Sequence, residues 1–414
     1  MGRQVLIIGA GASGMTAAVH AARAGAKVIL LEHRDRAGKK ILSTGNGRCN
    51  LTNLDQRPEC YRCGVPGFPQ GILEQFSVGD TLEFFGELGI LTKDRNGYIY
   101  PNSDQAASVR EALAEELGRL PVDVRYQCQI SRAAKEGKRF TVHSDKGIYE
   151  GDRVILAAGS RAAPVTGSDG SGYELAAAFG HRIVMPLPAL VQLKCAEKHY
   201  KKLAGVRCDG EIKLYVDGRE AACDRGELQL TDYGISGIPT FQVSRYASIA
   251  LHKRRKVTAV INFLPAMSRD QARDMMEKRF AMMGDRSCGQ FMNGLLNSKL
   301  SAVLLELAGI SQGQPAGTLG AGRRDRLFQA ITAYETRIEA ANPYENAQVC
   351  CGGVDVKQIN GKTLESKLVQ GLYFCGEILD VDGICGGYNL QWAWSSGAVA
   401  GRCAADCKGK GKCV

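Results

Sequence analysis

The chain has 414 residues, of which 44% are apolar and 23% are charged, and its formal net charge is +10. This length predicts two or three domains, and the ordinary composition excludes a disordered chain. No stretch approaches the ~20 uninterrupted apolar residues of a membrane helix, and no cleavage-site pattern follows the apolar N-terminus. We expect a soluble, cytoplasmic protein whose positive charge favours anionic partners such as phosphates, carboxylates or nucleic acid.

The N-terminal segment predicts one βαβ unit. Residues 4–8 (QVLII) are a short, continuous, branched run typical of a buried parallel strand. Residues 12–24 are alanine-rich and helical, and Gly25 follows where a helix stop is expected. Residues 27–31 (KVILL) predict a second strand, which ends at Glu32.

Further along, the pattern alternates between helices and strands. An irregular loop over 38–70 precedes mixed helical segments that extend to about residue 118. Strands are expected near 122–130, 139–143, 154–156, 211–216 and 227–231, with Asp217-Gly218 as a hairpin turn. Helices are expected over 171–179, from the capping box of Ser268 and Gln271 to about 308, over 323–340 and over 389–405.

These elements predict an α/β fold built on a Rossmann-type nucleotide-binding domain with a mostly parallel sheet. We expect this domain to combine residues 1–185 with residues 351–414. A β-rich domain (186–265), a helical subdomain (266–341) and a return segment (342–350) would be inserted between the two parts.

A glycine fingerprint lies at the first strand–helix turn. Gly9, Gly11 and Gly14 form G-x-G-x-x-G between a strand and a helix, with Glu32 eighteen residues after the last glycine. Gly9 permits the tight turn, Gly11 lets the backbone approach a pyrophosphate, and Gly14 lets helix and strand pack closely. The phosphates would meet the positive end of the helix. Glu32 can accept hydrogen bonds from ribose hydroxyls, which suits FAD or NAD rather than NADP.

Two further segments have the composition of ligand-binding loops. Residues 38–50 (GKKILSTGNGRCN) combine glycines with the donors Asn46, Arg48 and Asn50. Residues 376–391 (GEILDVDGICGGYNLQ) again place a glycine-rich turn before a helix start. We expect that second helix start to stabilise negative charge developing on a reduced flavin.

Fifteen cysteines are scattered along the chain. Because no secretory signal accompanies them, we expect reduced thiols in a cytosol rather than a disulfide framework. Cys60 and Cys63 form an isolated C-x-x-C without further ligands at a recognisable spacing, so we expect no metal.

Three motifs together resemble the BaiN-like (YhiN-like) flavoproteins, described as NAD(P)/FAD-dependent oxidoreductases. They are TGNGRCN (44–50), TGSDGSGY (166–173) and GEILDVDGICGGYNLQWA (376–393), and the resemblance extends over essentially the whole chain. It implies that the glycine turn and Glu32 bind the ADP half of FAD, and that the C-terminal motif lies along the pyrophosphate and flavin. Many members have T-H-x-G in the inserted domain, whereas this chain has Thr231-Asp232-Tyr233-Gly234, without the histidine.

The residues that we expect to contact FAD come from these segments and from the turn after the 154–156 strand. They are Gly9, Ala10, Gly11, Ala12, Ser13, Gly14, Glu32, His33, Lys40, Thr44, Gly45, Asn46, Arg48, Cys49, Asn50, Ala158, Gly159, Gly376, Glu377, Asp380, Gly386, Gly387, Tyr388, Asn389 and Leu390.

The activity that the resemblance implies is reduction of carbon–carbon double bonds in 3-oxo-Δ4 or Δ4,6 bile-acid intermediates. The small-molecule substrate would then be an apolar, anionic steroid acid. Reduced flavin would deliver hydride to the β-carbon of the enone, and Tyr233 or Tyr388 would protonate the α-carbon. No second dinucleotide fingerprint follows a strand, so we expect NAD(P)H to dock transiently on the inserted domain. No pattern predicts an oligomeric state.

Three alternatives share the FAD motifs. The first is an FAD-dependent oxidase of a small amine, which would be reoxidised rapidly by oxygen. The second is a flavoprotein acting on RNA, which would use the positive charge although no RNA-reading motif is present. The third is a non-catalytic flavin-binding or redox-sensing module.

Overall fold

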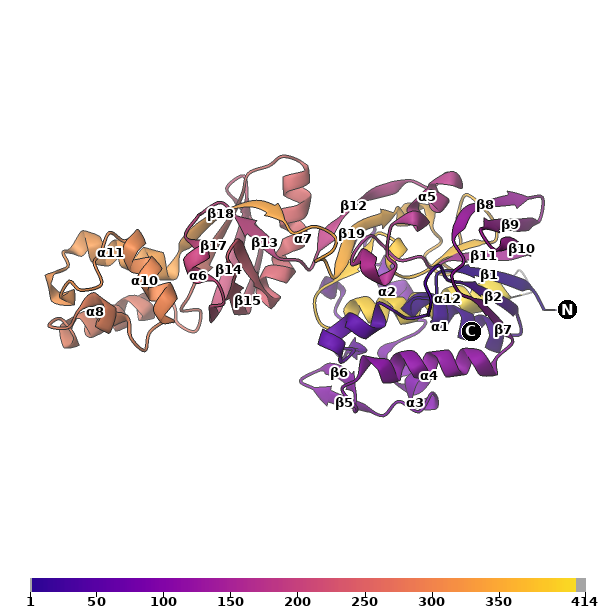
Figure 1. Ribbon diagram of the computed structural model, residues 1–414, viewed down its shortest axis with the longest axis horizontal. Coiled ribbons are helices and arrows are strands. Elements are labelled where there is room, and N and C mark those ends of the chain that lie inside the picture. The colour runs from indigo at the N-terminus through magenta and orange to yellow at the C-terminus, as the bar shows by residue number, and fades with distance from the viewer. Residues whose placement is uncertain (1, 407–414) are drawn as a thin grey trace. The chain divides into compact units, whose positions relative to one another are not determined.

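The computed structural model describes residues 2–406 (Figure 1). The chain divides into two compact units, the first from residues 1–186 and 349–414 and the second from residues 187–348. Residues 407–414 of the expected second part of the nucleotide-binding domain lie outside the described residues.

The first unit is built on a parallel five-stranded sheet with the order β20-β11-β1-β2-β7. Its strands are β1 (Gln4–Ile8), β2 (Lys27–Leu31), β7 (Val122–Arg125), β11 (Arg153–Leu156) and β20 (Leu372–Phe374). The predicted Rossmann-type sheet is thus confirmed. Ile8 lies opposite both Leu31 and Leu156, so the carboxyl ends of three strands meet at one edge. Gly9, Glu32 and Ala157 continue from that edge.

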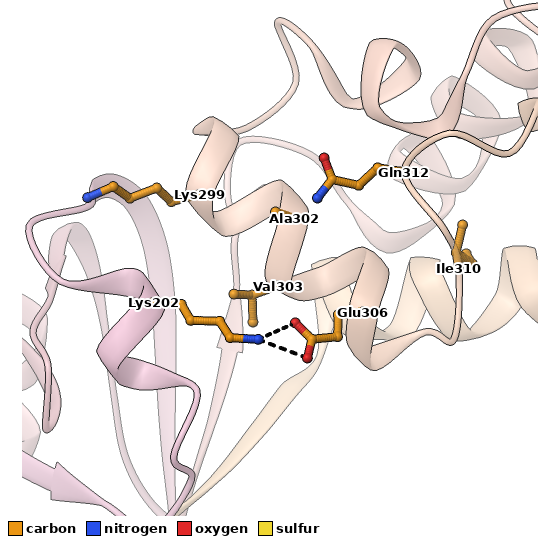
Figure 2. A pocket seen from close by; sticks show the side chains of 7 residues that line it. All are labelled: Lys202, Lys299, Ala302, Val303, Glu306, Ile310 and Gln312. Atoms are coloured by element: carbon orange, nitrogen blue, oxygen red, sulfur yellow. Dashed lines mark hydrogen bonds and ion pairs between the residues drawn. The ribbon is translucent and has the colours of Figure 1, made fainter.

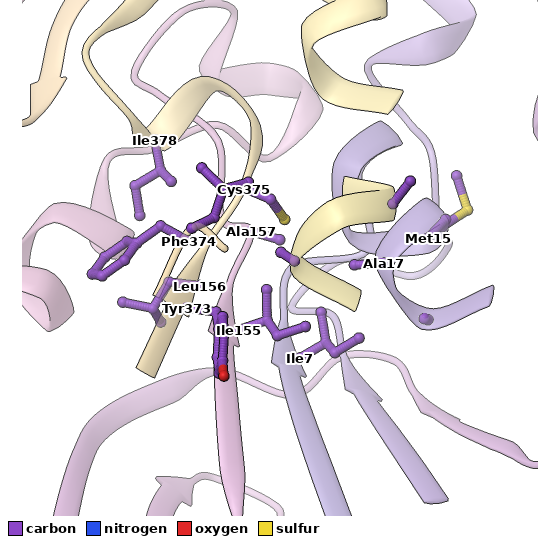
Figure 3. Close-up of a cluster of buried hydrophobic side chains, with 14 of the residues drawn as sticks. Ile7, Met15, Ala17, Ile155, Leu156, Ala157, Tyr373, Phe374, Cys375 and Ile378 are labelled. Carbon is purple, nitrogen blue, oxygen red and sulfur yellow. The ribbon is translucent and has the colours of Figure 1, made fainter. Parts of the chain in front are cut away.

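Two helices from opposite ends of the chain pack against each other on this sheet. They are α1 (Ala12–Arg23) and α12 (Tyr388–Ala405). A Cβ atom added to Gly401 would lie 2.3 Å from the Ala17 carbonyl oxygen, and one added to Gly397 would lie 2.5 Å from that of Ser13. The helix backbones therefore touch, and only glycine fits at these contacts. Figure 3 shows apolar side chains of the core in this unit, including Ile7, Ile155 and Phe374.

Smaller elements complete the first unit. Its other helices are η1 (Ile41–Gly47), η2 (Pro58–Cys60), α2 (Phe68–Leu73), α3 (Val78–Glu87), α4 (Ala106–Arg119), η3 (Pro164–Thr166), α5 (Ser171–Ala178), η5 (Val356–Gln358) and η6 (Gly376–Ile378). Its other strands are β3 (Thr52–Asn53), β4 (Tyr61–Cys63), β5 (Thr92–Arg95), β6 (Tyr98–Pro101), β8 (Ile130–Glu136), β9 (Arg139–Ser144), β10 (Gly147–Gly151), β19 (Val349–Val354) and β21 (Val381–Gly383). The strand β12 (Ile183–Ala189) pairs with β19 and leads into the second unit.

The second unit contains a closed antiparallel barrel with the order β13-β16-β15-β14-β17-β18. Its strands are β13 (Leu193–Cys195), β14 (Arg207–Val216), β15 (Arg219–Leu230), β16 (Gly234–Gly237), β17 (Val257–Asn262) and β18 (Tyr334–Ala341). Its helices are α6 (Tyr200–Leu203), α7 (Ile238–His252), α8 (Arg269–Met282), α9 (Cys288–Met292), α10 (Ser298–Leu307), η4 (Ala316–Thr318) and α11 (Ala321–Thr332). This unit has its own apolar core.

Two expectations for the inserted part are wrong in detail. The helix expected over 323–340 ends at Thr332, and residues 334–341 form the barrel strand β18, because Tyr334, Thr336 and Ile338 alternate with exposed residues. The helical subdomain therefore does not extend to residue 341. The helix α7 was not anticipated within the β-rich segment. The helical stretch expected from Ser268 to about 308 is confirmed and consists of α8, α9 and α10. The capping box of Ser268 and Gln271 is confirmed.

No helix among residues 2–406 combines the length and apolar character needed to cross a membrane.

Candidate functional site

The three fingerprint glycines have different roles. Gly9 has φ +100°, and a Cβ there would lie 2.6 Å from the Ala157 carbonyl oxygen. A Cβ at Gly14 would lie 1.9 Å from the Gly9 oxygen, so both residues are required by the packing of the fold. A Cβ at Gly11, in contrast, would have nothing within 4 Å. The open space at Gly11 is available to a ligand.

The N-terminus of α1 is uncapped. Gly11 is the N-cap residue and offers no side-chain acceptor, and the first turn holds no acidic residue. The N–H groups of Ala12, Ser13 and Gly14 begin the helix, where no preceding turn supplies carbonyl acceptors. These donors and the positive end of the helix dipole suit a phosphate group.

Glu32 is a buried carboxylate at the same edge of the sheet. Its Oε2 accepts the Ala10 N–H at 2.8 Å and its Oε1 accepts the Arg34 N–H at 2.8 Å. Because each carboxylate oxygen has two lone pairs, both can accept further hydrogen bonds from hydroxyl groups. The neighbouring His33 has a buried Nε2 that finds no partner among the described residues. Such an atom fits a site whose ligand completes the hydrogen bonding.

The 166–173 motif packs against this corner of the site. Arg34 donates to the Pro164 carbonyl at 2.9 Å, and a Cβ at Gly167 would lie 3.3 Å from His33 Nε2. Gly159 has φ +71°, and a Cβ there would lie 3.1 Å from Ser168 Oγ. The Ala158-Gly159 turn and this motif therefore lie next to the expected adenosine-binding residues.

The N-terminal and C-terminal motifs meet at three places. The Lys40 ammonium and the Glu377 carboxylate form a partly buried ion pair at 2.7 Å. The hydroxyl of Ser13 donates to the Cys375 carbonyl at 3.4 Å, and a Cβ at Gly376 would lie 2.3 Å from Ser13 Oγ. Glu377 Oε1 is buried and has no partner among residues 2–406. The glycine turn, the 38–50 loop and the C-terminal motif thus lie against one another.

The third contact joins Asn50 to the start of α12. With its amide oriented to satisfy both ends, Asn50 accepts the Gly387 N–H at 3.3 Å and donates to the Ile99 and Thr52 carbonyls. Gly387 occupies the N-cap position of α12 with φ +96°, but it has no side chain that could accept a hydrogen bond from the first turn. The uncapped start of α12 therefore lies beside the 44–50 loop, whose left-handed residues include Gly45, Asn46 and Cys49.

Several expected contact residues have their polar atoms engaged in the fold. Asn389 closes the turn before α12, since its Oδ1 accepts the Gly383 N–H at 2.9 Å and its Nδ2 donates to the Gly383 carbonyl. Asp380 Oδ1 accepts the Gly352 N–H at 3.1 Å, and the Thr44 hydroxyl donates to the Ile41 carbonyl.

Other expected contact residues differ in exposure. Cys49 is fully buried, and burial raises the pKa of its thiol to about 12. Leu390 packs against the core, while Asn46 and Arg48 are exposed.

The two candidate proton donors lie in different units. Tyr388 is buried against Tyr61, with ring centroids 5.8 Å apart, and burial together with a hydrogen bond to Cys60 raises the pKa of its phenol. Tyr233 belongs to the second unit, and its hydroxyl accepts a hydrogen bond from Asn342 Nδ2 at 3.1 Å.

Residues that the sequence analysis missed surround the Gly386 turn. A Cβ at Gly386 would lie 2.7 Å from the Tyr98 ring, and one at Gly45 would lie 3.6 Å from the Tyr100 ring. Asn53 Nδ2 donates to the Gly386 carbonyl at 3.1 Å. The spacing of Tyr98 and Tyr100 on one strand was a usable signal, because residues two apart share a face.

A pocket of about 460 Å³ lies in the second unit between α6 and α10 (Figure 2). Lys202 and Glu306 form an ion pair at 2.7 Å at this pocket. None of the expected site residues lines it. In the described part of the chain, every cysteine has a free thiol and no cluster of three potential metal ligands occurs.

Residues 3–403 match the family model described as HI0933-like protein Rossmann domain. The chain is 46% identical over 402 residues to a 3-dehydro-bile acid delta(4,6)-reductase from Clostridium scindens, covering 97% of this chain and 98% of that protein. It is 30% identical to ribosomal RNA dihydrouridine synthases from Escherichia coli (97% of each chain) and Haemophilus influenzae (94% and 96%).

Proposed function

This chain belongs to the HI0933-like Rossmann-domain family, and we propose that it is an FAD-dependent oxidoreductase that reduces the carbon–carbon double bond of an enone. The proposed substrate is a 3-oxo-Δ4 or Δ4,6 bile-acid (steroid) intermediate. The observation that carries this choice is the 46% identity, over nearly the full length of both chains, to a reductase named for such a substrate.

The residues at the sheet edge fit the two halves of FAD. The uncapped α1 N-terminus and the open space at Gly11 suit the pyrophosphate, and Glu32 and His33 suit the adenosine. The unpartnered oxygen of Glu377 and the uncapped start of α12 suit the flavin side. When bound, reduced FAD supplies the hydride, and NAD(P)H is the proposed electron donor.

The chain itself must move one proton and stabilise one charge. Charge develops on the enone oxygen as hydride reaches the β-carbon, and backbone N–H groups at a helix start stabilise such charge. A tyrosine then protonates the α-carbon. A tyrosine phenol carries its proton at physiological pH, and burial raises the pKa of Tyr388 further, so Tyr388 would give up this proton only to a strongly basic centre such as the developing α-carbanion. Tyr233 is the second candidate for this step.

Reduction of uridine in ribosomal RNA is a second candidate function, favoured by the two relatives at 30% identity. Its chemistry is close to the first, because the reduced bond of a uracil is also conjugated to a carbonyl. The higher identity to the bile-acid reductase favours the steroid substrate.

Anaerobic turnover tests these alternatives directly. Purified holoprotein would be reduced with NADH or NADPH under anaerobic conditions, and separate samples would then be mixed with 3-oxo-Δ4 steroid acids, with rRNA transcripts, or with oxygen. We expect flavin reoxidation by the steroid, together with a product two hydrogens heavier by mass spectrometry. Dihydrouridine formation without steroid turnover would establish the second candidate. Rapid, peroxide-yielding reoxidation by oxygen with neither product would indicate an oxidase.

A further inference from the structure

The β5–β6 hairpin carries a face composed of basic and aromatic side chains. In the register of the two strands, Lys93 lies opposite Tyr100 and Arg95 lies opposite Tyr98. Because these positions alternate along the two strands, all four side chains share one face, while Ile99 on the opposite face is buried. We call this set, together with Arg48, the hairpin face.

The hairpin face adjoins the start of α12. A Cβ at Gly386 would lie 2.7 Å from the Tyr98 ring, and the Gly45 position in the loop before Arg48 lies next to the Tyr100 ring. Arg95 lies over the Tyr100 ring, 5.5 Å from its centroid. The face therefore borders the turn that we assign to the flavin side of the cofactor.

The charges on this face are not balanced. The Asp104 carboxylate oxygen Oδ2 forms ion pairs with Lys93 Nζ at 2.6 Å and with Arg95 Nη2 at 2.8 Å. The hydrogen bond from Lys93, followed by the charges of Arg95 and Arg48, lowers the pKa of Asp104, so Arg48 lies near this carboxylate, although no ion pair joins Arg48 to a described residue. Arg48 itself is exposed. It extends from a segment fixed by the left-handed residues Asn46 and Cys49 and by the buried Asn50. Three cationic side chains thus surround one carboxylate, and this excess of positive charge leaves the exposed Arg48 guanidinium able to bind an external anion.

We propose that the hairpin face binds the anionic end of the substrate. Arg48, which the sequence predicted to contact FAD, would instead pair with a carboxylate, and the rings of Tyr98 and Tyr100 would pack on the attached apolar rings. This inference rests on the proposed function. A guanidinium binds carboxylates in a bidentate manner, and Tyr98, which is 41% exposed, offers an apolar surface with few rotamers to lose. A phosphate of the pyridine nucleotide has related chemistry and is the source to be distinguished.

The test compares a steroid acid with its neutral methyl ester in wild type, Arg48→Ala and Arg48→Lys. We expect Arg48→Ala to lower kcat/KM about tenfold more for the acid than for the ester, with partial rescue by lysine. The matched control is Arg119→Ala, because Arg119 is an exposed arginine on α4 without an ion-pair partner in the described chain. This control should affect both substrates equally. Flavin content and the rate of reduction by NAD(P)H are measured on each variant.

Equal losses for acid and ester would overturn the proposal. Loss of FAD from Arg48→Ala, or slower reduction by NAD(P)H with the acid preference intact, would also overturn it and assign Arg48 to the cofactor or the donor. Calorimetric binding of the saturated steroid acid to the holoprotein separates this inference from the proposed function. If the protein reduces no enone, the proposed function is wrong. If Arg48→Ala binds the steroid acid as tightly as wild type does, only the role proposed for Arg48 is wrong.

Discussion

At the scale of single residues, Gly11 and Gly14 look equivalent in the sequence but differ in the structure. Gly14 has no room for a Cβ because the Gly9 carbonyl oxygen would lie 1.9 Å away, whereas Gly11 has nothing within 4 Å. The first requirement comes from folding and the second, as we propose, from the ligand. Substitution of each residue separates these roles.

We expect Gly11→Val to fold normally and to lose bound FAD, because the branched side chain would occupy the space of the pyrophosphate. The ratio of flavin to protein absorbance and the thermal midpoint of the apoprotein measure the two effects. Gly14→Val is the control, and it should lower the free energy of unfolding by roughly 3 kcal/mol or more, through overpacking. A Gly11→Val protein with full flavin content would refute the assigned cofactor position.

The buried His20 should make the free energy of unfolding fall as the pH is lowered. Burial, followed by the charges of Arg402 and Arg23, lowers the pKa of His20 from 6.5 to about 3. Between these values the unfolded chain binds a proton that the folded chain does not, so the stabilising contribution is present above pH 6.5 and is lost as the pH falls.

Substitution of His20 by phenylalanine removes this titration and keeps a ring between Phe76 and Phe84. Denaturant unfolding at pH 6.5 and 4.5 should show wild type losing roughly 2 kcal/mol more than His20→Phe. Parallel pH profiles for the two proteins would disprove the assignment.

At the scale of elements, the pairing of α1 with α12 holds the site together. Glycines on α12 lie against backbone atoms of α1, so helix propensity and packing oppose each other at these positions. The Ser396 hydroxyl also accepts the Gly376 N–H at 2.9 Å, and Trp392 Nε1 donates to the Gly376 carbonyl at 3.1 Å. The same helix therefore orients the C-terminal motif.

Two glycine-to-alanine substitutions should change the free energy of unfolding in opposite directions. Gly401→Ala places a Cβ 2.3 Å from the Ala17 oxygen and should cost about 2 kcal/mol or more in unfolding free energy. In α4, a Cβ at Gly118 would have no atom within 4 Å, so Gly118→Ala should raise the free energy of unfolding by about 0.5–1 kcal/mol. Urea midpoints measure both changes. A neutral Gly401→Ala would show that the helix contact is looser than described.

At the scale of the whole molecule, the second unit is an insertion with its ends close together. The Gln348 N–H donates to the Leu190 carbonyl at 3.4 Å, and the Asn342 N–H donates to that of Gln192 at 2.9 Å. The unit has a closed barrel and a separate apolar core. These features are typical of a domain that folds independently.

We therefore expect residues 187–348, expressed alone, to unfold cooperatively and to bind no FAD. Circular dichroism during thermal unfolding and dispersion of amide NMR signals would establish folding, and flavin fluorescence would report binding. A fragment without a cooperative transition would contradict this expectation, and one that binds FAD would challenge the site in the first unit.

The sequence by itself determined the features that depend on local spacing. The βαβ unit, the glycine turn, Glu32 at the strand end and the capping box at Ser268 all follow from patterns within about thirty residues. These patterns are readable because strand and helix periods and turn chemistry act over short distances.

The tertiary structure decided which distant segments meet. Lys40 pairs with Glu377, Asn50 binds the turn at Gly387, and Tyr98 covers Gly386, all across more than 280 residues. The strand β18 likewise pairs with β13 and β17 to close the barrel, a long-range pairing that the helix expected over 323–340 missed. Such contacts arise from packing between elements rather than from local preference, so no sequence window contains them.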